Sequence, residues 1–212
     1  MHVETRDLTD TVVLVTGAGA GIGAATAELL TDHGARVVVA DRDLDAATTL
    51  TDRLPEGRAL ARTMDVRSPD DARAAVRAAV ERWGRLDSVV CNAGIGVFGG
   101  ILDYPDERLA AIVDTNVLGT VWAVRAAVEQ FDTAGAGGDI VIVASVAGLG
   151  TASGQESVYA ATSSVRSASP SPWIVSSGRV ASVSARSPRP RSTPASRTGS
   201  AAPPTTPSRS PT

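Results

Sequence analysis

A glycine-rich turn between an apolar strand and a helix constrains the fold of this chain more than any other stretch. Residues 12–15 (VVLV) are consecutively apolar, as in a strand that is buried on both faces of a parallel sheet. Thr16 and a run of alternating glycines follow, and then a helical pattern from Ile22 to Leu30. This geometry directs free backbone N–H groups and the positive end of a helix dipole at a phosphate. The predicted phosphate-binding residues are Thr16, Gly17, Gly19, Gly21, Ile22 and Gly23.

A second buried strand is predicted over residues 36–40 (RVVVA), and an acidic residue, Asp41, stands at its C-terminal end. A carboxylate at the end of such a strand accepts hydrogen bonds from ribose hydroxyls and repels a 2′-phosphate, which favours NAD over NADP. Arg42 keeps NADP as the less favoured alternative, because an arginine pairs with that phosphate. A solvated turn without a ligand also remains an alternative for this Asp-Arg-Asp stretch.

Strand and helix patterns alternate along the chain up to residue 162. Further strands are predicted over 59–64, 86–91 and 139–144, and further helices over 44–54, from Ser68 to Gly84, and over 107–131. This alternation predicts an α/β fold with a Rossmann-like, doubly wound parallel sheet. Ligands of such sheets bind at the carboxyl ends of the strands. Gly17, Asp41, Asn92 and Ser145 fall at these ends, and the further predicted cofactor contacts are Asp65, Val66, Ala93 and Gly94.

Several motifs in this order resemble the short-chain dehydrogenase/reductase family over residues 11–162. The glycine turn reads T-G-x-x-x-G-x-G, and Asn92-Ala93-Gly94 is similar to N-N-A-G with Cys91 in place of its first asparagine. Asn116 begins a motif similar to N-V-x-G, and Tyr159 follows Ser145 by fourteen residues. The resemblance implies an oxidoreductase that transfers hydride between NAD(H) and a secondary alcohol or ketone. It assigns Tyr159 as general acid/base, Ser145 as the group that polarises the substrate oxygen, and Asn116 as support for a water chain. It also places Asp65 against the adenine.

The lysine that the family pattern Y-x-x-x-K requires is absent, because Ser163 stands four residues after Tyr159. A phenol titrates near pH 10 and needs a nearby positive charge to act as a base at neutral pH. We therefore expect this chain to be catalytically impaired.

The composition changes sharply at the same place. Residues 163–212 contain seven arginines, 15 serines and nine of the 12 prolines, but none of the 23 acidic residues. A one-base slip after Thr162 accounts for this, because a restored frame returns a lysine at position 163, an amphipathic helix and a strand. The alternative is a genuine disordered tail. Sequencing the gene around codon 163 distinguishes the two.

This break predicts two regions, an NAD-binding domain over 1–162 and a Ser/Pro/Arg-rich tail over 163–212 that is disordered or frameshifted. The last strands and the helix after Tyr159 are expected to be missing or scrambled, so that the sheet ends at its fifth strand with an exposed edge. For the same reason, a lysine placed at position 163 by itself is not expected to restore activity. A second functional hypothesis is a non-catalytic nucleotide-binding or interaction protein with a basic tail.

The remaining composition excludes several other classes. One cysteine precludes an internal disulfide and fits a reducing compartment, and no His/Cys cluster indicates a metal site. The polar N-terminus and the lack of an 18-residue apolar run predict a cytoplasmic protein without a membrane partner. A tail with few aromatic residues does not favour nucleic-acid binding. The expected partner is a small-molecule alcohol or ketone, and a homo-oligomer is expected if the family's intact C-terminus is present.

Overall fold

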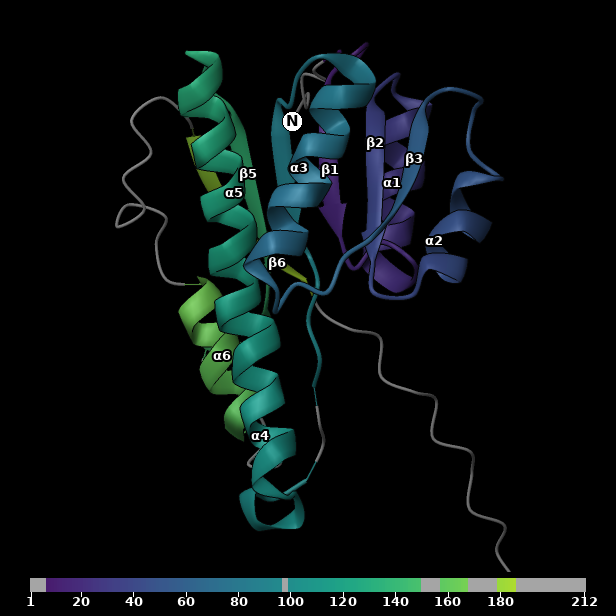
Figure 1. Ribbon diagram of the computed structural model, residues 1–212. Coiled ribbons are helices and arrows are strands. Elements are labelled where there is room, and N and C mark those ends of the chain that lie inside the picture. The colour runs from purple at the N-terminus through teal and green to yellow at the C-terminus, as the bar shows by residue number, and fades with distance from the viewer. Residues whose placement is uncertain (1–6, 97–98, 150–156, 168–178, 186–212) are drawn as a thin grey trace, which may run out of the picture.

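The computed structural model describes residues 7–96, 99–149, 157–167 and 179–185 (Figure 1). Its six described strands form one sheet in the order β3-β2-β1-β4-β5-β6, and every neighbouring pair is parallel. This confirms the doubly wound fold, with the crossover at β1 that brings β4 beside it. The strands are β1 (Val12–Thr16), β2 (Arg36–Asp41), β3 (Ala59–Thr63), β4 (Ser88–Cys91), β5 (Asp139–Ser145) and β6 (Arg179–Ala185).

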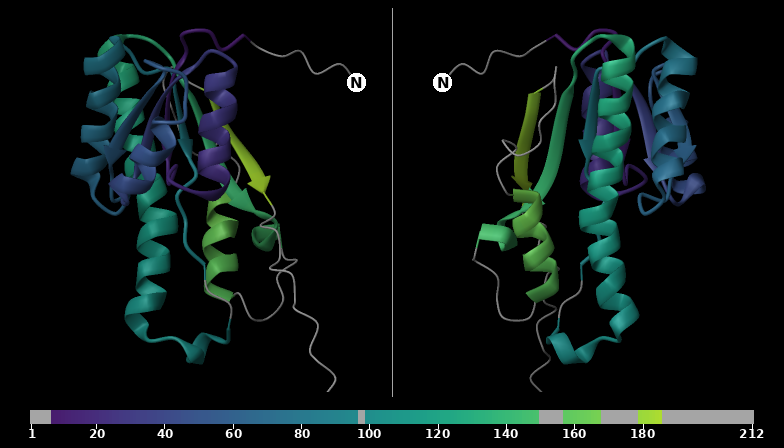
Figure 2. Two further views of the ribbon diagram at one scale, coloured as in Figure 1. Left: turned by 90° about the vertical axis from the view of Figure 1, so that its right-hand side faces the viewer. Right: turned by 60° about the vertical axis from the view of Figure 1, so that its left-hand side comes forward.

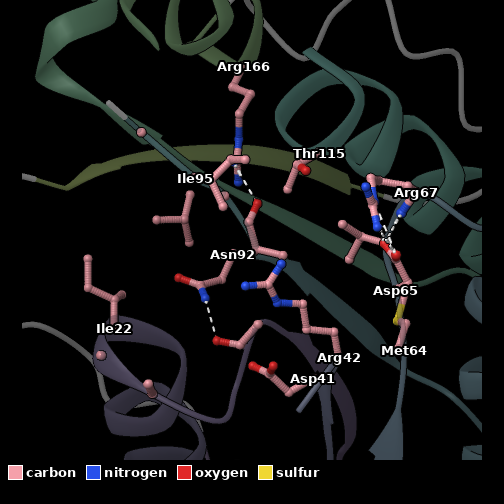
Figure 3. Close-up of a pocket in the computed structure, with 18 of the residues that line it drawn as sticks. Ile22, Asp41, Arg42, Met64, Asp65, Arg67, Asn92, Ile95, Thr115 and Arg166 are labelled. Carbon is pink, nitrogen blue, oxygen red and sulfur yellow. Dashed lines mark hydrogen bonds and ion pairs between the residues drawn. The ribbon is translucent and has the colours of Figure 1, made fainter. Parts of the chain in front are cut away.

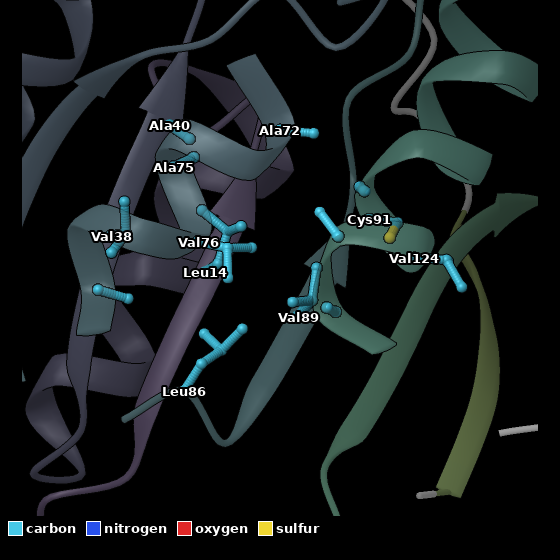
Figure 4. Close-up of a cluster of buried hydrophobic side chains, with 14 of the residues drawn as sticks. Leu14, Val38, Ala40, Ala72, Ala75, Val76, Leu86, Val89, Cys91 and Val124 are labelled. Carbon is cyan, nitrogen blue, oxygen red and sulfur yellow. The ribbon is translucent and has the colours of Figure 1, made fainter. Parts of the chain in front are cut away.

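Helices cover both faces of the sheet, with α3 and α5 on one side and α1 on the other (Figure 2). Alternate residues of β1 supply the two cores: Leu14 packs among residues of α3 and α5, whereas Val15 packs among residues of α1 and α2. Figure 4 shows the first of these clusters. The described helical elements are α1 (Gly21–Asp32), α2 (Leu44–Thr51), α3 (Pro69–Trp83), η1 (Ile101–Asp103), α4 (Asp106–Val113), η2 (Asp114–Leu118), α5 (Gly119–Ala134), η3 (Val146–Leu149) and α6 (Ser157–Ser167).

The ends of α3 follow from its sequence. The Ser68 hydroxyl accepts a hydrogen bond from the backbone N–H of Asp71 at 3.1 Å, and Pro69 occupies the first turn, where no N–H is needed. Gly84 ends the helix in a left-handed conformation with φ of 78°. These signals confirm the predicted helix and deliver the chain into β4.

The single long helix expected over 107–131 is divided by one π-helical turn, η2, which lies between α4 and α5. A π turn widens the helix locally, and such turns inside α-helices often occur at functional sites. The stretch Asp106–Ala134 is long and apolar enough to cross a membrane by length and composition. However, 44% of its most apolar window is buried inside the protein, where α5 packs against α3 and β4.

The C-terminal region departs from the sequence-based expectation within its described residues. Helix α6 continues through position 162 as far as Ser167, and β6 pairs with the whole length of β5. The expectation of a sheet ending at the fifth strand is therefore wrong. The backbone of an edge strand gains its hydrogen bonds from a single neighbour, and residues 179–185 (RVASVSA) include two β-branched valines that favour extended backbone. The rest of the expected tail, 168–178 and 186–212, lies outside the described residues.

Candidate active site

A cavity of about 720 Å³ opens at the carboxyl ends of the strands (Figure 3). It brings together eleven of the residues that sequence reasoning selected: Gly17, Gly21, Ile22, Asp41, Arg42, Asp65, Val66, Asn92, Ala93, Gly94 and Tyr159. Thr16, Gly19, Gly23, Asn116 and Ser145 do not line it. Residues that sequence reasoning missed complete the wall together with Ser163, the position of the absent lysine: Ala20, Met64, Arg67, Ile95, Gly96, Thr115, Val143, Ala144 and Arg166.

The glycine turn is shaped by close backbone approaches. Gly17 has φ of +63°, and a Cβ there would lie 2.8 Å from the Cα of Ala93. A Cβ on Gly23 would lie 2.3 Å from the carbonyl oxygen of Gly17, so only glycine lets α1 begin so close to β1. No side chain caps the N-terminus of α1. Its first N–H groups therefore remain free for an anion beside the cavity.

Thr16 fastens the glycine turn to the loop after β4. Its hydroxyl accepts hydrogen bonds from the backbone N–H groups of Asn92 at 3.0 Å and Ala93 at 3.1 Å. The Asn92 amide in turn donates to the carbonyls of Thr16 at 3.0 Å and Gly17 at 3.1 Å. Thr16 was selected as a cofactor contact, but its side chain is buried. Its role in the structure is to hold the glycine turn against the loop after β4.

Asp41 lies at the carboxyl end of β2 with both carboxylate oxygens fixed by backbone donors. Oδ2 accepts from the N–H of Gly19 at 2.9 Å, and Oδ1 accepts from the N–H of Asp43 at 3.0 Å. Each oxygen keeps a further lone pair, so the carboxylate can still accept from a ligand hydroxyl. Gly19 thus acts on the site through Asp41 and does not line the cavity itself.

The far wall of the cavity carries an ion pair between Asp65 and Arg67, with oxygen and nitrogen 2.5 Å apart. The hydrogen bond from Arg67 is the main reason that the pKa of the Asp65 carboxyl lies below its usual value, and the charge of Arg42 contributes to the same shift. Arg42 therefore interacts with a carboxylate across the cavity as well as standing next to Asp41.

Asn116 lies in the π turn and is 1% exposed. Its Oδ1 accepts from the N–H of Ile95 at 2.8 Å, and its Nδ2 donates to the carbonyl of Ile95 at 2.9 Å and to the hydroxyl of Thr162 at 3.0 Å. One side chain therefore joins the helix, the loop after β4 and α6. The buried asparagine has the partners that physical reasoning requires.

The two residues assigned to proton chemistry come from different elements, Tyr159 from α6 and Ser145 from the end of β5. Tyr159 is half-buried on α6 and lines the cavity, where its ring lies 3.3 Å from the place that a Cβ on Gly96 would occupy. Ser145 ends β5 next to the cavity-lining Ala144 and is 8% exposed. Its hydroxyl accepts a hydrogen bond from the N–H of Ala147 at 3.2 Å.

Arg166 is a cavity residue that the sequence analysis did not select. Its guanidinium donates to the carbonyls of Cys91 at 2.6 Å and Ala93 at 2.9 Å, and the residue is 8% exposed. In Figure 3 this side chain extends from α6 toward the loop that carries Asn92. Burial lowers the pKa of the Arg166 guanidinium, an effect that Cys91 and Tyr159 oppose. Its spacing of seven residues from Tyr159, two helical turns, was the signal available in the sequence.

Ser163 also lines the cavity, at 3% exposure. The position that the family gives to lysine is thus on a formed helix, facing the site, and the expectation that no helix would hold it is wrong. No group of three or more His, Cys, Asp or Glu residues could hold a metal ion in the described ranges.

Comparison with known proteins places these features in a family. Residues 11–164 match the profile of the short chain dehydrogenases. The chain is 38% identical over 148 residues to L-rhamnose 1-dehydrogenase (NAD(P)(+)) of Azotobacter vinelandii, which covers 67% of this chain and 58% of that enzyme. It is 35% identical over 148 residues to the uncharacterized oxidoreductase YxnA of Bacillus subtilis, over 69% of this chain and 42% of the relative. The chain thus spans about half the length of these relatives.

A solved structure agrees with the sequence relatives. The 3-ketoacyl-(acyl-carrier-protein) reductase of Brucella melitensis, solved with NADH, is 32% identical, with a TM-score of 0.77 over 84% of this chain and 76% of that one. The family profile matches most of the described fold. The glycine-rich turn after β1, which suits a dinucleotide, points to the same conclusion. This chain belongs to the short-chain dehydrogenase/reductase family of oxidoreductases.

Proposed function

We propose that this protein transfers hydride between NAD(H) and a secondary alcohol or ketone. The observation that carries the proposal is a single cavity that joins the glycine turn, Asp41 and Tyr159. A dinucleotide lying along the strand ends would place its pyrophosphate at the start of α1 and its reactive ring toward α6.

The residues present fit such a cofactor. Gly17 and Gly23 leave a cradle without side chains at the start of α1, and the free N–H groups there suit a pyrophosphate. Asp41 would accept hydrogen bonds from the adenosine ribose, while the half-buried Asp65 and buried Val66 would flank the adenine. The nicotinamide, when bound, supplies or accepts the hydride.

The protein's own chemistry is proton transfer at the substrate oxygen. In ketone reduction, the Tyr159 hydroxyl donates its proton to the oxygen as the carbonyl carbon gains hydride, and in alcohol oxidation the phenolate takes that proton back. The Ser145 hydroxyl donates a hydrogen bond to the same oxygen and stabilises its developing charge. Turnover is reduced in this chain, because Ser163 supplies no positive charge to Tyr159.

NAD is the proposed cofactor in preference to NADP. The Asp41 carboxylate is held at the end of β2 by two backbone donors, so it cannot turn away from a 2′-phosphate. The charge of Arg42 contributes to the lowered pKa of the Asp65 carboxyl, so Arg42 already has an acidic neighbour besides Asp41. The proposed setting is a cytoplasmic enzyme, a homo-oligomer in its intact form, with no membrane or nucleic-acid partner.

The test is ketone-dependent oxidation of NADH by the whole chain, paired with NADH affinity from calorimetry. Tyr159→Phe is expected to reduce turnover by about 10²-fold or more, and Ser145→Ala by about 10²-fold, with NADH affinity almost unchanged. Tyr104→Phe serves as the control for losing a phenol elsewhere. NADH binding without any turnover on a panel of ketones and secondary alcohols would favour the non-catalytic nucleotide-binding alternative.

A further inference from the structure

The side of α6 that faces the cavity bears a positive charge, although the lysine is missing. Tyr159, Thr162, Ser163 and Arg166 recur at the spacing of one helix face, and the last three are buried. The Tyr159 ring packs over Gly96, and a Cβ on Gly94 would lie 2.9 Å from Nη1 of Arg166. Phenol and guanidinium therefore lie against the same short loop.

The Arg166 guanidinium is fixed but not neutralised. Its two hydrogen-bond acceptors, the carbonyls of Cys91 and Ala93, are uncharged. In the part of the chain that the structure describes, no carboxylate forms an ion pair with it, and its buried Nε–H has no acceptor. A guanidinium stays protonated at neutral pH even when buried. The Arg166 guanidinium is therefore charged and has no carboxylate partner among the described residues.

Other charged groups near α6 are poorly placed to do the same. Those on the packed elements α4 and η2, namely Asp106, Glu107, Arg108 and Asp114, are all exposed. On the neighbouring strands, Asp139 begins β5 and Arg179 begins β6, paired in register at the end opposite Ser145. Across the cavity, Asp65 pairs with Arg67 and attracts Arg42, and Asp41 is bound by backbone donors. Besides Tyr159, the Cys91 thiol is the group whose charge bears on the pKa of Arg166 within the described residues, and burial keeps that thiol protonated.

We propose that Arg166 is a positioning residue for proton transfer: its buried guanidinium supplies, from two helical turns beyond Tyr159, the positive charge that stabilises the phenolate of Tyr159. A neighbouring opposite charge favours the ionised form of a group, and low polarity around it strengthens the effect. This inference rests on the proposed function of Tyr159 as the acid/base. It leaves Arg166 acting through Tyr159 and not on the substrate.

The ionisation of Tyr159 can be followed without any cofactor or substrate. The chain has two tyrosines, so in a Tyr104→Phe background the tyrosinate absorbance at about 295 nm reports on Tyr159 alone. Adding Arg166→Gln is expected to move the absorbance transition upward by about one pH unit. Arg166→Lys, which keeps the charge, is expected to leave the transition near its original pH. Arg125→Gln, which removes an exposed arginine of α5, is the matched control.

Two further variants make the result decisive. Ser163→Lys added to Arg166→Gln returns a charge one turn from Tyr159 and is expected to bring the transition back down. If the glutamine variant does not fold, as judged by circular dichroism, Arg166→Met keeps the apolar stem and takes its place. A transition that moves no further for Arg166→Gln than for Arg125→Gln overturns the proposal, as does an equal shift for the lysine and glutamine variants. Because no turnover is measured, failure here is distinct from failure of the proposed dehydrogenase activity.

Discussion

Replacing Asn116 with alanine is expected to loosen the joint between the helix, the active-site loop and α6. The side chain is almost completely buried and makes three hydrogen bonds, two with the backbone of Ile95 and one with Thr162. Alanine removes all three and leaves the N–H of Ile95 without its acceptor. Thr162 still donates to the carbonyl of Tyr159, so its hydroxyl loses only an incoming bond.

The magnitude follows from this inventory. Each lost hydrogen bond costs about 1 kcal/mol net, and a buried partner left unsatisfied costs about 1–3 kcal/mol. Ile95 is half-buried and can be reached by water once the loop moves, so the total falls at about 2–4 kcal/mol. With a urea m-value of about 2–3 kcal/mol/M, the unfolding midpoint drops by about 1 M.

Urea unfolding followed by tryptophan fluorescence measures this loss, and hydrogen exchange at the Ile95 amide reports it locally. Thr120→Val is the matched control, because it removes one bond of 2.8 Å to the Asn116 carbonyl and leaves the loop untouched. It is expected to cost about 1 kcal/mol. If Asn116→Ala costs no more than Thr120→Val and leaves exchange at Ile95 unchanged, the joint does not carry the stability assigned to it.

Two further predictions concern the cofactor and the missing lysine. The protein is expected to favour NADH over NADPH by more than about tenfold in kcat/KM, and Asp41→Ala is expected to erode that preference; equal use of both cofactors by the unchanged chain contradicts the role of Asp41. Ser163→Lys in the otherwise unchanged chain is expected to raise kcat by about tenfold or more, because α6 already directs position 163 at the cavity. An unchanged kcat, with Tyr159 still required, would show that charge at this position does not limit proton transfer.

The parts of the fold set by local physics could be predicted from the sequence. Residues 12–15 and 37–40 are continuous apolar runs, as expected of strands with both faces buried, and both lie in interior strands of the sheet. Ser68 and Gly84 mark the ends of α3 by capping chemistry. Because parallel strands end at one edge, Asp41, Asn92 and the glycine turn were expected to lie together, and they do.

The features that could not be predicted depend on tertiary partners. The π turn at Asn116 exists together with hydrogen bonds to Ile95 and Thr162, which are distant in the sequence. Strand β6 has weak apolar patterning and takes its register from β5, so a reading based on composition missed it. Arg166 resembled one more arginine of a basic tail, since nothing local indicated that the carbonyls of Cys91 and Ala93 would accept hydrogen bonds from it.

The reaction rate of the Cys91 thiol measures how often the central strands of the sheet separate. This single cysteine ends β4, between β1 and β5 at the centre of the sheet, and burial raises the pKa of its thiol to about 12. Thiol reagents attack the thiolate, so the closed protein is protected both by access and by protonation. Labelling therefore proceeds through openings that separate the central strands. The ratio of its rate to that of the unfolded chain gives the free energy of opening of the domain's centre, with no residue changed.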